Sequence, residues 1–105
     1  MGIETLKPFT QKQFLHISFS WSGKTKIDEL LPKFDLALDW VRYAPNCWIV
    51  YTTSNADKWY GRLSAYLGKG DHMLICRLDV SEKQGWLPSW IWDWLNNPDE
   101  KRMEK

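Results

Sequence analysis

Residues 39–53 read DWVRYAPNCWIVYTT and predict a β-hairpin near the middle of the chain. Both ends of this stretch are rich in β-branched and aromatic side chains, which favour strands. At its centre, Ala44-Pro45-Asn46 is a turn signal. We therefore expect a short strand, a turn and a longer strand. Val41 has two candidate positions, in the first strand of the hairpin or at the end of a preceding helix.

A strand and a helix are predicted before the hairpin. Residues 14–20 alternate, with Leu15, Ile17 and Phe19 on one face of the strand. The period then changes to the three- and four-residue steps of an amphipathic helix. The apolar residues of this helix are Ile27, Leu30, Leu31, Phe34, Ala37, Leu38 and Val41. Pro32 interrupts it, so either the helix begins near Leu31 or its first turn is irregular.

A second helix and a last strand are predicted after the hairpin. Ser54 is a suitable N-cap, and the acidic Asp57 favours a helix N-terminus. Apolar residues from Ala56 to Leu67 then recur on one helical face, and Gly68 can end the helix. Residues 72–79 alternate again as a strand.

The segment Gly85–Leu95 holds four of the eight tryptophans. Tryptophan buries a large apolar area, so this cluster must pack on the domain's own core, a second copy of the chain or a ligand. Pro88 fits the first turn of a short helix, and Asn96-Asn97-Pro98 ends it. The helical spacing predicts that the core-facing side chains are Trp90, Ile91, Trp94 and Leu95. Trp92 lies on the flank and is the tryptophan that we expect to meet another molecule.

The order strand, helix, strand, strand, helix, strand predicts an α+β protein. Its simplest topology is a ferredoxin-like βαββαβ sandwich, here followed by a short C-terminal Trp-rich helix. The 105 residues are enough for a single domain, 1–105. We expect an ordered core over about residues 12–97 and a flexible tail over 98–105.

Charge and composition narrow the classes of function. The net charge is +1, which gives no basic stripe to attract nucleic acid. No apolar run is long enough to span a bilayer, and the first residues lack the features of a signal peptide, so we expect a cytoplasmic protein without membrane contact. Cys47 and Cys76 fit no zinc spacing, and the ferredoxin-like strand order separates them by one strand, so we expect two free thiols.

The hairpin, the last strand at Asp71–Leu78 and the closing Gly85-Trp86-Leu87-Pro88 together resemble a group of small bacterial SinR-like proteins. These proteins are distantly related to the second CRISPR-associated protein, the small subunit of the spacer-integration complex. The resemblance spans roughly residues 14–95 and consists of apolar and aromatic positions. It implies a ferredoxin-like fold, homodimers and a link to mobile-element or defence biology.

One departure from the CRISPR-associated relatives concerns chemistry. In those relatives the first strand often ends with an aromatic residue and an aspartate, the proposed metal ligand for phosphodiester cleavage. The matching place here is Phe19-Ser20. A hydroxyl does not supply the charge that holds Mg²⁺, which disfavours a metal-dependent nuclease.

Interface candidates follow from the predicted faces of the strands. His16 lies opposite Leu15 and Ile17, where it could be a general base, but a hydrogen-bonded interface or surface histidine is the favoured interpretation. In the last strand, Leu74, Cys76 and Leu78 are expected to face the helices. Met73 and Ile75 then join His16 on an open face that invites a second copy of the chain. The interface candidates are His16, Met73, Ile75 and Trp92.

The alternative is a nucleic-acid-binding protein or a degenerate nuclease. Trp48 and Tyr51 on a sheet strand could stack bases, and Arg77 is a third candidate. No clear groove of Lys and Arg surrounds these aromatics, and packing in the core or an interface is their favoured role. The sequence therefore predicts a non-enzymatic, homodimeric binding or regulatory protein with an unidentified protein partner. No catalytic residue, metal site or cofactor is predicted.

Overall fold

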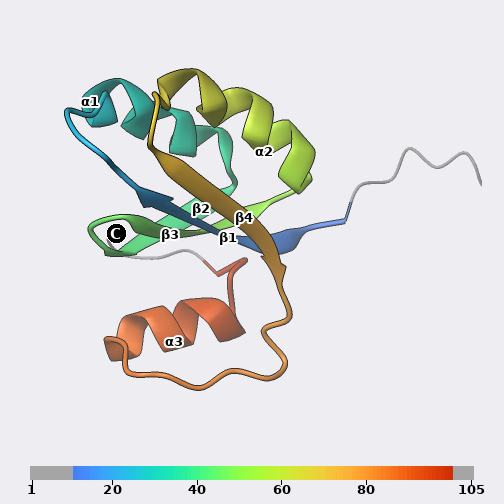
Figure 1. Cartoon of the computed structure of the whole chain (residues 1–105). Helices are drawn as coiled ribbons and strands as arrows, with labels where there is room; N and C mark the ends of the chain where they lie inside the picture. The colour runs from blue at the N-terminus through green and yellow to red at the C-terminus, as the bar shows by residue number, and fades with distance from the viewer. Residues whose placement is uncertain (1–10, 101–105) are drawn as a thin grey trace, which may run out of the picture.

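A computed structural model describes residues 11–100 of the chain. It is a small α+β protein with a four-stranded antiparallel sheet between helices on its two faces (Figure 1). The α+β class predicted from the sequence is confirmed. In chain order the elements are β1 (Gln13–Ser20), α1 (Ile27–Leu30), the 3₁₀ helix η2 (Leu31–Leu36), β2 (Asp39–Ala44), β3 (Cys47–Thr52), α2 (Ala56–Leu63), the 3₁₀ helix η3 (Ser64–Tyr66), β4 (His72–Leu78) and α3 (Ser89–Asn96).

The strand order in the sheet is β2-β3-β1-β4. β1 pairs antiparallel with β3 on one side and with β4 on the other, and β2 pairs with β3 in the predicted hairpin. β1 and β3 are therefore central, and β2 and β4 are the edge strands.

The first face of the sheet carries α1, η2, α2 and η3, as the upper part of Figure 1 shows. Leu15, Ile17 and Phe19 of β1 are buried there, as their alternation predicts. The Trp48 ring stacks on Phe34 of η2 with 4.6 Å between ring centroids. Trp59 of α2 is also fully buried, and its indole Nε1 donates a 3.1 Å hydrogen bond to the Thr52 hydroxyl. These aromatic contacts hold the helices on the sheet.

The helix predicted from Ile27, with Val41 left open between its end and the hairpin, does not extend past Leu36. The α-helical turn ends at Leu30, and a 3₁₀ helix with Pro32 in its first turn continues to Leu36. Proline has no N–H and fixes its φ, which the first turn of a helix accommodates, so the 3₁₀ helix that begins at Leu31 agrees with the first of the two starts that the sequence left open. Val41 is buried in β2, which assigns it to the hairpin.

The second helix begins one residue later than predicted. Asn55, and not Ser54, is the N-cap, and its side chain accepts a 2.8 Å hydrogen bond from the Lys58 backbone N–H. The Ser54 N–H donates instead to the Thr52 hydroxyl at 3.0 Å. Asparagine and serine are about equally good caps, so the local sequence does not distinguish them.

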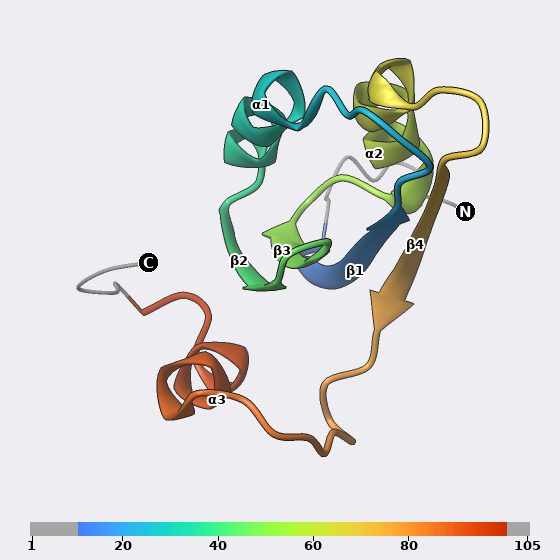
Figure 2. The same ribbon diagram turned by 60° about the vertical axis from the view of Figure 1, so that its left-hand side comes forward.

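The second face of the sheet is covered in part by α3, which lies on the opposite side from α1 and α2 (Figures 1 and 2). Ile91, Trp94 and Leu95 are buried against Phe14, Val41, Ile49 and Tyr51. The Trp94 indole Nε1 donates a 2.9 Å hydrogen bond to Asp39 of β2. Trp90, predicted to face the core, is 41% exposed, so that part of the prediction is wrong. Its position lies on the flank of the face formed by Ile91 and Leu95.

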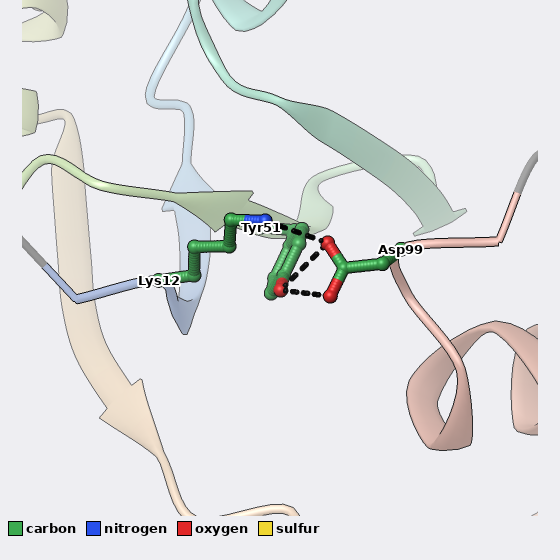
Figure 3. Close-up of polar contacts among 3 residues, drawn as sticks. All are labelled: Lys12, Tyr51 and Asp99. Carbon is green, nitrogen blue, oxygen red and sulfur yellow. Dashed lines mark hydrogen bonds and ion pairs between the residues drawn. The ribbon is translucent and has the colours of Figure 1, made fainter.

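Asp99 joins the end of the described chain to its beginning. Its carboxylate accepts hydrogen bonds of 3.1 Å from the Tyr51 hydroxyl and 3.0 Å from the Lys12 ammonium (Figure 3). These contacts draw the segment after α3 toward the end of β3. In the predicted tail, Asp99 therefore makes specific contacts, and residues 101–105 lie outside the described part.

A second carboxylate ties the loop after β1 to the turn before β4. Asp71 accepts hydrogen bonds from the backbone N–H groups of Ser22 and Gly68, both at 2.8 Å, and from the Ser22 hydroxyl at 3.2 Å. Gly70 in the same turn has a φ of 86°, a conformation that favours glycine. The loop and the turn thus support each other.

Among residues 11–100, no helix is long and apolar enough to cross a membrane.

Candidate functional site

A cavity of about 380 Å³ lies between the second face of the sheet and the segment 79–88 that links β4 to α3. Figure 2 shows this segment running away from the sheet before it returns to α3. Because α3 is short and covers only part of the sheet, the neighbouring part of this face borders the cavity. The apolar lining comes from four parts of the fold, namely Ile49, Leu78, Val80, Leu87, Trp92 and Leu95.

A pair of polar rings, His16 of β1 and Tyr43 of β2, forms one wall of this cavity. His16 Nε2 and the Tyr43 hydroxyl are hydrogen-bonded at 2.6 Å. Burial lowers the pKa of His16. Burial also raises the pKa of Tyr43, and a hydrogen bond with the Cys47 side chain raises it further. At neutral pH the wall is therefore polar but uncharged.

The mouth of the cavity carries charged side chains from the segment after β4. Asp79, Glu82 and Lys83 all border it. Hydrogen bonds from the Ser81 hydroxyl and backbone N–H lower the pKa of Asp79, which keeps this carboxylate ionised. The Lys83 ammonium donates a 2.7 Å hydrogen bond to the Val80 carbonyl. The side chains that border the mouth are thus two carboxylates and one ammonium, and the charge of Arg77, which does not border the cavity, also contributes to the lowered pKa of Asp79.

Trp86 borders the same cavity and is 99% exposed. Next to it, the backbone of Gly85 lies against Trp92, since a Cβ built at Gly85 would be 3.7 Å from the Trp92 ring. An exposed tryptophan leaves a large apolar surface in water, so packing of the Trp86 ring against another molecule would be favourable. The cavity thus combines an apolar floor, a neutral polar wall and an exposed aromatic side chain at its opening.

Two of the four interface candidates, His16 and Trp92, are brought together at this cavity. Trp92 is half-buried against the α3 cluster, so it has internal partners that the sequence did not indicate. Met73 and Ile75 were predicted on the same face as His16, and this is wrong. They lie opposite Phe19 and Ile17 in the antiparallel register and pack against the helix-side core.

The corresponding error concerns the other residues of β4. Leu74, Cys76 and Leu78 were predicted to face the helices, but they lie opposite Ser18, His16 and Phe14 on the second face of the sheet. Both faces of β4 carry apolar side chains, so alternation alone could not orient the strand; only the register with β1 does so.

The two aromatic nucleic-acid candidates are buried. Trp48 is 0% exposed and Tyr51 is 7% exposed, so neither ring is open to a base. Arg42 lies over the Trp48 ring at 4.7 Å, and the Tyr51 hydroxyl is bonded to Asp99. Arg77 is exposed on β4, but the rings of the other two candidates are not accessible.

The cysteines are both free thiols, on β3 and β4, with β1 between these strands as expected. Within the described part of the chain, no group of three or more His, Cys, Asp or Glu side chains is arranged to hold a metal ion.

Sequence reasoning missed Tyr43 and Trp86 as site residues. The sequence did hold a signal for Trp86, because it follows the polar stretch Ser81–Gly85 and precedes the proline that opens the helix. Such a position lies in a loop, where a tryptophan has few neighbours to bury it. For Tyr43 the only signal was its alternation with Val41, which places both on the second face once the hairpin is accepted.

Comparison with protein-family models, with curated proteins and with solved structures found no match to this chain.

Proposed function

We propose that this chain is a non-enzymatic binding protein with a ferredoxin-like fold and that it acts as a homodimer. The order of elements, strand, helix, strand, strand, helix, strand, supports the fold assignment. The central position of β1 and β3, with β4 and β2 at the edges, supports it too. In this proposal α3 is an addition that covers part of the face opposite the two helices.

The dimer forms through the edge strand β4. In the part of the chain that the structure describes, β4 pairs with β1 alone, so its outer edge is available for another strand. If β4 pairs antiparallel with the β4 of a second copy about a two-fold axis, the free backbone N–H and C=O groups of both edges are hydrogen-bonded. The observation that carries the proposal is Leu74, which is 59% exposed on this edge strand. Pairing two such strands removes apolar surface from water.

The groove beside β4 adds surface on its other face. Met73 and Ile75 line this groove together with Tyr60 of α2, which is itself 59% exposed. A copy of the chain that pairs with β4 therefore meets apolar side chains on both faces of the strand. This keeps Met73 and Ile75 as interface candidates although their face differs from the predicted one.

Sedimentation equilibrium tests the dimer. We expect the chain to have twice its 12.5 kDa mass at micromolar concentration. Leu74→Lys places a charge on the edge strand and should give a monomer. Leu36→Lys is the matched control, because Leu36 is 55% exposed in η2, away from β4, and this variant should remain a dimer. A wild-type chain that stays monomeric at high concentration contradicts the proposal.

The resemblance to SinR-like proteins supports a role in mobile-element or defence biology, with a further protein partner. The nucleic-acid alternative is tested by binding to single- and double-stranded oligonucleotides at several salt concentrations. Binding that weakens steeply with salt would favour that alternative, since phosphate contacts release counterions. We expect no such binding, because the net charge is +1 and the candidate rings Trp48 and Tyr51 are buried.

A further inference from the structure

We propose that the cavity between the sheet and residues 79–88 binds a small aromatic molecule that carries a positive charge. The aromatic ring enters the apolar interior, and the cationic group remains at the mouth beside Asp79 and Glu82. The lining includes Leu78 at the end of β4 but not Leu74, the residue that carries the proposed dimer, so the inference does not depend on that dimer.

The volume and lining of the cavity favour a ring system. Ligand sites in proteins are mostly apolar with a few polar groups, and their volumes begin near about 300 Å³. An apolar cavity of about 150 Å³ already accepts benzene. The cavity here is about 380 Å³, so a bicyclic ring can be accommodated. Trp92 and Leu95 of α3 and Ile49 of β3 offer it apolar contacts on two sides.

The wall and the mouth place different demands on the ligand. His16 and Tyr43 hold each other by a 2.6 Å hydrogen bond and carry no charge at neutral pH, so the interior offers no counter-charge and disfavours a buried ion. The charge lies at the mouth, where the Asp79 carboxylate remains ionised and Glu82 is its neighbour, and where the Lys83 ammonium is held by the Val80 carbonyl. A ligand with an apolar ring and a cationic substituent matches both parts.

Trp86 supplies the remaining contact. It borders the opening and is almost wholly in water in the free protein. A rotation of this side chain over the bound ring covers apolar surface of both partners. The tryptophan face also attracts a cation within about 6 Å of its centroid. Trp86 is therefore the residue that we expect to change its environment most on binding.

The test uses three probes that share the indole ring and differ in charge: tryptamine, indole and indole-3-acetate. Each is titrated into the full chain, and the indole N–H signals of the protein are followed by two-dimensional NMR. We expect tryptamine to bind more tightly than indole, and indole more tightly than indole-3-acetate, with shifts at Trp86 and Trp92. The preference for tryptamine over indole should be about threefold or more at low salt and smaller at high salt.

Two pairs of variants separate the parts of the proposal. Trp86→Ala should weaken tryptamine binding by about two- to tenfold, whereas Trp90→Ala, on α3 outside the cavity, should leave it unchanged. Glu82→Gln should reduce the preference for tryptamine over indole without affecting indole itself. Glu29→Gln on α1 is its control and should change neither affinity.

Several outcomes overturn the proposal. Failure of both tryptamine and indole to bind at millimolar concentration excludes the site, as do shifts confined to residues away from the cavity. Equal affinities for the three probes remove the charge preference. Because oligomeric mass is measured separately, each of these results leaves the proposed dimer unaffected, and a monomeric wild type leaves this site unaffected.

Discussion

Trp94→Ala tests whether α3 is an integral part of the core. Trp94 is 2% exposed, lies edge-on to Phe14 with 5.2 Å between ring centroids, and donates its indole N–H to Asp39. Burying a tryptophan removes about 150–250 Å² from water. At about 25 cal/mol per Å² this area corresponds to ~4–6 kcal/mol. Truncations of buried aromatics cost about 3–5 kcal/mol in practice, and we expect a loss in that range.

The measurement is urea unfolding followed by far-UV circular dichroism, with the free energies of unfolding compared between variants. A chain of this size has a total stability of about 5–15 kcal/mol, so the expected loss is a large shift of the midpoint. Trp94→Phe keeps a ring against Phe14 but leaves Asp39 without this donor, and it should cost about 1–2 kcal/mol.

Trp86→Ala is the matched control for this series. It removes the same side chain from a position that is 99% exposed, so we expect a change within about 0.5 kcal/mol. If Trp94→Ala also costs less than about 1 kcal/mol, α3 does not contribute to the core in solution, and the reasoning from its contacts is refuted.

Three further predictions concern the turn at Gly70 and the hydrogen bonds of Asp71 and Tyr51. Gly70→Ala should lower the free energy of unfolding in urea by about 1–2 kcal/mol, because the φ of 86° disfavours a side chain and the new Cβ would be 2.8 Å from the Ser22 hydroxyl oxygen. Gly61→Ala in α2 is the control: nothing lies within 4 Å of its new Cβ, so it should raise the free energy of unfolding by about 0.5–1 kcal/mol. Asp71→Asn should flatten the acid limb of a profile of unfolding free energy against pH, because hydrogen bonds to its carboxylate lower the pKa of Asp71. The stabilisation by Asp71 is present above the ordinary pKa of 3.8 and is lost as the pH falls through the lower pKa of the folded state. An identical acid limb in the variant would contradict this. Tyr51→Phe should lower the free energy of unfolding by about 0.5–1.5 kcal/mol through loss of the hydroxyl bond to Asp99, and an unchanged midpoint would show that this bond contributes nothing.

The sequence predicted the elements of this fold better than it predicted their faces. The alternation of Leu15, Ile17 and Phe19 placed one side of β1 correctly, because polar residues separate these apolar positions. In β4 the same rule failed, since Met73, Leu74, Ile75 and Cys76 are consecutive and apolar. A strand with two apolar faces is oriented by its pairing with β1, which is a contact between residues far apart in the chain.

The cavity could not be predicted for a related reason. Tyr43 and His16 are separated by 27 positions along the chain, and their side chains meet across β3, which lies between β2 and β1. Both border the cavity beside α3. Sequence patterns report which residues are apolar and with what period. They do not report where a short helix stops covering a sheet, and the site depends on that boundary.

Helical periodicity alone does not predict which of Trp90 and Trp92 is the more buried. Both flank Ile91, each rotated by about 100° from it, so the spacing of the buried residues does not distinguish them. Trp92 is half-buried and Trp90 is 41% exposed. The difference arises from the segment before the helix, whose Gly85 backbone lies against the Trp92 ring. The path of that segment, and not the helix itself, decides which flanking tryptophan becomes part of the cavity wall.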